Sequence, residues 1–233
     1  LMKAVAGACA TLSEPAMRPG GLLSGFLDLV VVDASVISLH KLLAEKFPAC
    51  RSRESSTRAS LKLHLVMSVF AASPRMVQLF SERTKELKML KVGKWVAGRL
   101  LLFDLGYYMF SLFERIGRNG GYFISRAKDN FNPVITGNNT TCRGRSVELV
   151  GKRLQDVLPL LKRKSFDVEA QLDIKRRSYN GKQSIVSKAF RVVGVLNEET
   201  GTYHIYITNV PGSQLSPEDV ARTYRARWEG ELL

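Results

Sequence analysis

The fold is decided by an apolar stretch that runs into a carboxylate: Leu27-Asp-Leu-Val-Val-Val-Asp33-Ala-Ser-Val-Ile37. Successive β-branched and apolar residues are typical of a buried strand, and the small polar residues after Asp33 predict that the strand ends there. A second stretch repeats the pattern: Gly98-Arg-Leu-Leu-Leu-Phe-Asp104-Leu-Gly-Tyr-Tyr108. An Asp at the end of a central strand is well placed to face a cleft, although a structural Asp is the simpler interpretation of either one alone.

The residues around these stretches complete an order of elements. Residues 61–81 predict a hairpin with its turn at 72–75, and residues 82–92 favour a helix. Beyond Asp104, residues 110–116 predict a helix closed by Gly117, and residues 120–128 predict a strand with Arg126 and Lys128 at its end.

This order matches an α/β fold of the ribonuclease H-like type, a mixed sheet flanked by helices. In that fold the first and fourth strands are neighbours. Because adjacent strands lie about 4.8 Å apart, Asp33 and Asp104 could then share a metal ion.

The last stretch, residues 216–233, predicts a helix with a chemically unusual face. Ser216 is typical of an N-cap, Pro217 of the first helical position, and two acidic residues follow in the first turn. At about 100° per residue, one face of roughly 100° carries a ring, a guanidinium, an indole and a carboxylate. These belong to Tyr224, Arg227, Trp228 and Glu231. An amphipathic helix with a chance Arg–Glu pair is the alternative interpretation.

The spacing Tyr-x2-Arg-x3-Glu resembles the signature of the DDE transposases of bacterial insertion sequences, in the subgroup with the Tyr-Arg-Glu-Lys motif, insertion-sequence family four. In that family a Lys follows the Glu on the same helix face, and this sequence ends at Leu233 before that position. The sequence also opens at Leu1 rather than Met, so we expect a fragment of a longer reading frame.

The resemblance implies that Asp33, Asp104 and Glu231 are the catalytic, metal-binding triad. Carboxylates suit Mg²⁺ or Mn²⁺, and two such ions about 3.5 to 4 Å apart support phosphoryl transfer on DNA. The reaction would be cleavage at transposon ends followed by strand transfer into target DNA. The DNA-contacting residues would be Tyr224, Arg227, Trp228, Arg126 and Lys128, with Trp228 either stacking on a base or packing the helix onto the sheet.

Residues 129–210 predict short alternating strands joined by polar turns such as Asn180-Gly181. We expect four parts: a linker or remnant of an upstream region at 1–25, the first part of the catalytic core at 26–128, a β-rich insertion at 129–210, and the final helix at 211–233. The family carries an insertion at the same place.

The composition favours a polyanionic partner. Among 233 residues, Lys and Arg exceed Asp and Glu by a net charge of +14, and no apolar run is long enough to span a bilayer. We expect DNA as the partner, no membrane association, a cytoplasmic, nucleoid-associated location and, from the resemblance, a homodimer in the synaptic complex. A metal-dependent nuclease of the same fold and a non-catalytic DNA-binding relic remain alternatives.

Overall fold

The computed structural model describes residues 21–50, 58–142, 145–146, 148–161, 163–175, 180 and 184–229. The chain divides into two compact units, Leu1–Val92 and Gly93–Leu233. Each unit is described by itself.

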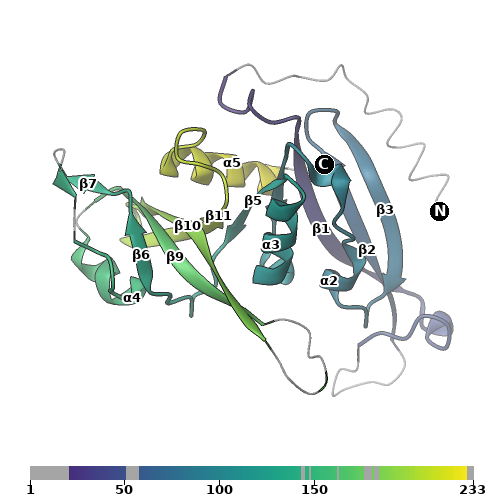
Figure 1. Cartoon of the computed structure of the whole chain (residues 1–233). Helices are drawn as coiled ribbons and strands as arrows, with labels where there is room; N and C mark the ends of the chain where they lie inside the picture. The colour runs from purple at the N-terminus through teal and green to yellow at the C-terminus, as the bar shows by residue number, and fades with distance from the viewer. Residues whose placement is uncertain are drawn as a thin grey trace. The chain divides into compact units, whose positions relative to one another are not determined.

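The first unit holds a three-stranded antiparallel sheet in the order β3-β2-β1 (Figure 1). The strands are β1 (Asp28–Leu39), β2 (Ala59–Ser68) and β3 (Ser73–Ser81), with the short helices η1 (Lys41–Leu43) and α2 (Glu86–Met89). Strands β2 and β3 pair from Leu61 opposite Ser81 to Ser68 opposite Ser73. The hairpin predicted from the sequence is therefore confirmed.

Two expectations for this unit were wrong. Strand β1 does not end at Asp33 but continues to Leu39, because β2 pairs with it along the whole length, as far as Ala59 opposite Leu39. The helix expected over 82–92 is a single turn, α2. Its N-cap, Lys85, makes no side-chain capping hydrogen bond, and so short a segment does not offset the cost of starting a helix.

The second unit holds a mixed sheet in the order β4-β5-β11-β10-β9-β6 (Figure 1). Strands β4 and β5 run parallel, and the other neighbours run antiparallel. The strands are β4 (Arg99–Phe103), β5 (Tyr122–Arg126), β6 (Ile135–Asn138), β9 (Ser165–Lys175), β10 (Ile185–Asn197) and β11 (Thr202–Thr208), and β7 (Thr141–Cys142) pairs separately with β8 (Arg145–Ser146). The helices are α3 (Phe110–Arg118), α4 (Leu154–Val157), α5 (Pro217–Glu229), η2 (Lys94–Val96), η3 (Leu105–Tyr107) and η4 (Leu158–Leu160).

Helices α3 and α5 cover opposite faces of this sheet. Phe113 of α3 stacks on Phe123 of β5 with ring centroids 4.3 Å apart. Tyr224 of α5 contacts Tyr206 of β11, with centroids 5.2 Å apart. Tyr206 lies opposite Arg126, three residues from Phe123, and side chains an odd number of positions apart on a strand point to opposite faces. The residues of β4 and β5 that face α5 therefore alternate with those that face α3.

Helix α3 ends two residues later than the sequence predicted. Gly117 lies inside the helix, and the chain leaves it after Arg118. Gly120, at φ +72°, takes the left-handed conformation that turns the chain into β5, and the Gly121 N–H bonds back to the Ile116 carbonyl oxygen at 3.0 Å. Glycine adopts that conformation at little cost.

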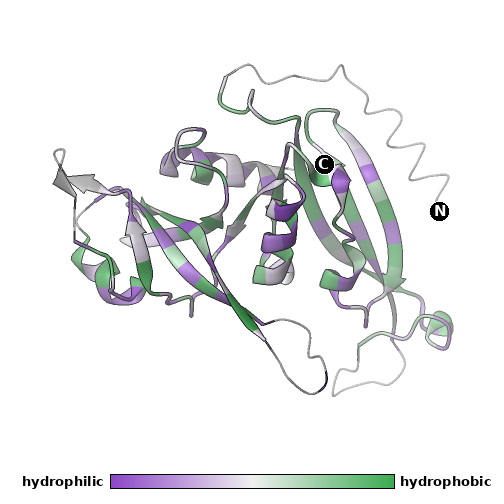
Figure 2. Cartoon of the chain, in the orientation of Figure 1, coloured by the Kyte–Doolittle hydropathy of each residue, from purple (hydrophilic) through white to green (hydrophobic). Residues whose placement is uncertain are grey.

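The strands predicted within 129–210 are confirmed as elements. Strand β9 alternates buried and more exposed residues, a pattern visible in its hydropathy (Figure 2). Because β11 pairs with β5, β9, β10 and β11 extend the same sheet as β4 and β5. The division into a core, an insertion and a final helix stays a prediction.

Candidate functional site

Asp104 lies at the carboxyl end of β4, as predicted. It follows the last residue of the strand in extended backbone, at the N-cap position of η3 but with no side-chain capping hydrogen bond, and its side chain is 47% exposed. Phe103 pairs with Ser125 in the parallel register of β4 and β5. Asp104 therefore comes next to Arg126, at the same end of the sheet.

Helix α5 begins as the sequence predicted. The Ser216 hydroxyl accepts a hydrogen bond from the Asp219 N–H at 3.2 Å, and the Asp219 carboxylate accepts one from the Ser216 N–H at 3.2 Å. This reciprocal cap, with Pro217 as the first helical residue, fixes where the helix starts and hence which side chains face the sheet.

Two residues of the Tyr-x2-Arg-x3-Glu motif meet the end of β4. The Tyr224 hydroxyl donates to the Phe103 carbonyl oxygen at 3.1 Å. The guanidinium of Arg227 lies 3.9 Å from a carboxylate oxygen of Asp104 and 5.8 Å from the ring centroid of Tyr224. The structure therefore brings Asp104, Tyr224 and Arg227 together.

Both of these helix side chains are buried. Tyr224 is 3% exposed and Arg227 2% exposed. Burial is the main cause that raises the pKa of the Tyr224 hydroxyl, with Arg227 acting in the opposite direction. The phenol therefore stays a hydrogen-bond donor at neutral pH. Neither side chain is exposed at the protein surface in this structure. Their predicted contacts with DNA phosphate stay a prediction.

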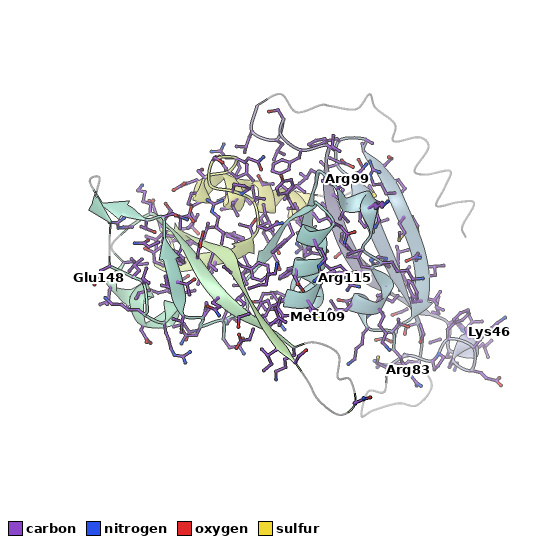
Figure 3. The ribbon with its side chains drawn as sticks, in the orientation of Figure 1. Lys46, Arg83, Arg99, Met109, Arg115 and Glu148 are labelled. Carbon is purple, nitrogen blue, oxygen red and sulfur yellow. The ribbon has the colours of Figure 1, made fainter. Side chains whose placement is uncertain are left out.

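The two predicted basic residues after β5 differ in environment. Arg126 is half-buried, at the end of the strand and opposite Tyr206. Lys128 is exposed, with its ammonium 5.2 Å from the ring centroid of Tyr108. Further exposed cations lie on each unit, among them Lys46 and Arg83 on the first and Arg115 on the second (Figure 3).

The remaining members of the predicted triad stay a prediction. Asp33 lies in the middle of β1, half-buried, where the strand changes from buried to exposed residues, and it accepts a hydrogen bond from the Ser35 hydroxyl at 3.2 Å. Asp33 belongs to the first unit and Asp104 to the second, so their convergence is a prediction too. Glu231 lies outside the described residues, as does the side chain of Trp228 in α5.

The carboxylates have the right chemistry for a divalent ion. Within the described part of the chain, no three His, Cys, Asp or Glu side chains form a metal-binding group. Asp33 and Asp104 offer oxygen ligands, which Mg²⁺ and Mn²⁺ prefer. The ion pair from Arg227 to Asp104 is long at 3.9 Å, and the Asp104 side chain is half-exposed. The Asp104 carboxylate is therefore accessible to a metal ion.

Sequence reasoning missed two residues beside the site, Arg225 and His204. Arg225 is exposed on α5, and His204 lies two residues before Tyr206 on β11. The period-two alternation of β11 could have found His204, because it puts His204 on the face of Tyr206.

Comparison with known proteins identifies the family. The model of the transposase DDE domain matches residues 24–233, and the chain belongs to this family. It is 23% identical over 242 residues to the transposase for insertion sequence element IS1151 of Clostridium perfringens, covering 91% of the chain and 50% of that protein. The chain thus spans about half the length of this relative.

Among solved structures, the chain is similar to the piggyBac transposase synaptic complex with hairpin DNA. The TM-score is 0.43 at 9% identity, over 87% of the chain and 38% of the piggyBac chain. Within the described residues, no helix of the chain combines the length and the apolar character that crossing a membrane requires.

Proposed function

We propose that this chain is the catalytic domain of an insertion-sequence transposase of the Tyr-Arg-Glu-Lys subgroup, with a ribonuclease H-like core. It cleaves DNA at the transposon ends and transfers the strand into target DNA. The observation that carries the proposal is the packing of Tyr224 and Arg227 onto the strand end that bears Asp104. Within a transposase DDE domain, that packing supports a catalytic role for the motif.

In this proposal Asp33, Asp104 and Glu231 hold two Mg²⁺ or Mn²⁺ ions. When bound, the ions supply an activated water or 3′-hydroxyl and stabilise the leaving oxygen. The protein's own contribution is placement: the end of β4 and the hydrogen bond from Tyr224 to Phe103 fix the backbone that carries Asp104. The positive charge of Arg227 lies beside that carboxylate and would favour the approach of a phosphate to the site.

The partner in this proposal is DNA, at transposon ends and at the target. Arg126 and Lys128 supply backbone contacts, and their position at the carboxyl end of β5, next to Asp104, supports that role. Trp228 contributes either stacking on a base or packing of α5. The homodimeric synaptic complex implied by the resemblance belongs to the same proposal.

The test is Mn²⁺-dependent nicking and joining by the full-length protein, with a supercoiled plasmid that carries the ends of the element. Asp33→Asn and Asp104→Asn each remove an anionic metal ligand and should lower nicking by about 100-fold or more, at least the cost of misplacing a reacting group by about 1 Å. Asp156→Asn is the matched control, since Asp156 is exposed on α4. Nicking without joining would favour a nuclease. Activities unchanged by both substitutions would favour a DNA-binding relic.

A further inference from the structure

A groove of about 530 Å³ opens beside Tyr224, on the face of the sheet that α5 covers. Helix α5 forms one side, with Tyr224 and Arg225, and the hairpin of β10 and β11 forms the other. Arg126, His204 and Tyr206 also line it. We call it the β11 groove.

The register of the strands aligns this groove with Asp104. Phe103 pairs with Ser125, so the next position along β4 is Asp104 and along β5 is Arg126. Arg126 in turn lies opposite Tyr206 of β11. Since neighbouring strands are about 4.8 Å apart, the path from Asp104 to Tyr206 is about 10 Å long. That is about the rise of three nucleotides of one DNA strand.

Two positive charges act on His204 within the groove. Burial lowers the pKa of His204, and the positive charges of Arg126 and Arg225 lower it further. Both guanidiniums are therefore close enough to oppose a proton on this imidazole. Of the two carboxylates that line the groove, Glu198 pairs with Lys164 at 2.8 Å and Glu199 is exposed to solvent.

His204 is held as a neutral ring. The Asn197 side-chain oxygen accepts a hydrogen bond from the Glu199 N–H at 2.9 Å. The Asn197 amide nitrogen then faces Nε2 of His204 at 3.3 Å. This assignment makes Nε2 an acceptor and leaves the proton on Nδ1.

We propose that the β11 groove binds a phosphate of the DNA backbone, with Arg126 and Arg225 supplying the charge and neutral His204 an N–H donor. The inference rests on the proposed function, in that the ligand is the strand whose scissile bond lies at Asp104. It adds Arg225 and His204 to the DNA-contacting residues. The groove would hold the strand about three nucleotides from the cleavage point.

The test compares two arginines on the same helix. Arg225 lines the groove, whereas Arg222 is 72% exposed, pairs with Asp219 at 3.8 Å and does not line it. Arg225→Gln and Arg222→Gln remove the same charge from α5. Fluorescence anisotropy with a labelled 20-base-pair duplex would measure Kd at several concentrations of NaCl, from about 50 to about 200 mM.

The salt slope is the slope of the logarithm of the binding constant against the logarithm of the NaCl concentration, and one lost phosphate contact lowers its magnitude by about 0.9. Arg225→Gln should therefore weaken DNA binding at low salt. The ratio of its Kd to the wild-type Kd should fall about threefold over that salt range. Arg222→Gln should leave the slope unchanged. His204→Leu should weaken binding with no change of slope at about pH 8, because a neutral donor releases no counterion. His204→Gln, which keeps an N–H donor, should restore part of the loss.

Equal salt slopes for the two arginine variants, either both lowered or both unchanged, would overturn the proposal that the β11 groove binds a phosphate. The outcome is separable from the proposed function. If wild type nicks transposon ends and Arg225→Gln keeps the full salt slope, phosphate binding in the β11 groove is wrong and the proposed transposase function is retained. If Arg225→Gln alone lowers the salt slope and Asp104→Asn leaves every activity unchanged, phosphate binding in the β11 groove is supported and the catalytic proposal is wrong.

Discussion

The Tyr224 hydroxyl donates to the carbonyl oxygen of Phe103, the residue immediately before Asp104. Tyr224 is therefore bonded to the backbone that carries the carboxylate. Its ring contacts Tyr206 and lies 5.8 Å from the Arg227 guanidinium. In this structure the tyrosine of the motif positions Asp104.

Replacing Tyr224 by Phe tests this positioning role. The substitution keeps the ring and removes one buried hydrogen bond, which should cost about 1 kcal/mol of the free energy of unfolding. Because the Phe103 carbonyl loses its restraint, we expect Mn²⁺-dependent nicking by the full-length protein to fall by about tenfold or more. Thermal unfolding and plasmid nicking measure the two effects.

Tyr203→Phe is the matched control. The Tyr203 hydroxyl donates in the same unit, with the Arg163 carbonyl oxygen at 2.5 Å and the Leu161 carbonyl oxygen at 3.1 Å, and neither carbonyl belongs to the Asp104 site. It should lose similar stability with unchanged nicking. Equal loss of nicking in both variants would show that lower stability alone explains the effect of Tyr224→Phe.

A second prediction concerns the ion pair of Arg191 and Asp167, which is hydrogen-bonded to the segment that leads to α5. Arg191 bonds both oxygens of Asp167, with the closest approach at 2.7 Å, and donates to the Val210 carbonyl oxygen at 2.9 Å. Both side chains are largely buried. Arg191→Met leaves the Asp167 carboxylate without this partner, and we expect a loss of about 3 kcal/mol in the free energy of unfolding.

The double variant Arg191→Met/Asp167→Asn should recover part of that loss, since removing both charges of a buried pair costs less than removing one. Lys164→Gln is the control, because Lys164 and Glu198 form an exposed pair and its loss should leave the melting temperature unchanged. A double variant no more stable than Arg191→Met would contradict the account.

The sequence predicted those parts of the site that depend on local patterns. Asp104 is an example, because it directly follows the apolar run that forms β4. The start of α5 is another, since Ser216, Pro217 and Asp219 carry their own capping chemistry. Both predictions needed only neighbouring residues.

The parts that failed depend on contacts distant in sequence. Strand β1 continues past Asp33 because β2 supplies hydrogen-bond partners as far as Ala59 opposite Leu39, and no residue near Asp33 encodes that pairing. The hydrogen bond from the Tyr224 hydroxyl to the Phe103 carbonyl oxygen, 121 residues earlier, could not be predicted either, and the predicted phosphate contact of Tyr224 stays a prediction. A helical period assigns a side chain to a face but not to a partner on it.

A third prediction uses the tight contact between β9 and β10. Gly194 pairs with Phe166, and a Cβ at position 194 would lie 2.0 Å from the Phe166 ring. The ring is 1% exposed and cannot move outward without opening the core. Gly194→Ala should therefore cost about 3 kcal/mol, measured by chemical unfolding.

Gly93→Ala is its control. Gly93 has extended backbone, and no atom lies within 4 Å of the position that its Cβ would take, so the same added methyl should be close to neutral. A stable Gly194→Ala variant would mean that β9 and β10 separate more easily than their register implies.

The last prediction is a pH dependence of stability at His204. Burial and the charges of Arg126 and Arg225 lower its pKa in the folded state, so the unfolded chain binds this proton more readily. The stability that the neutral ring contributes is then complete above the unfolded pKa, near 6.5. It is lost as the pH falls below that value toward the folded pKa.

His204→Gln removes the titrating group and should flatten the fall in melting temperature between about pH 7 and about pH 5. His40→Gln is the control, because His40 is an exposed residue that caps η1 in the first unit. His64 is buried, and its pKa is lowered mainly by burial, so part of the fall in melting temperature at acid pH should remain in His204→Gln.

Adding duplex DNA should also reduce the fall in melting temperature of wild type at acid pH, because a phosphate in the β11 groove offsets the two guanidiniums that oppose the proton on His204. An acid response of His204→Gln identical to that of wild type would show that the imidazole is not where the structure puts it.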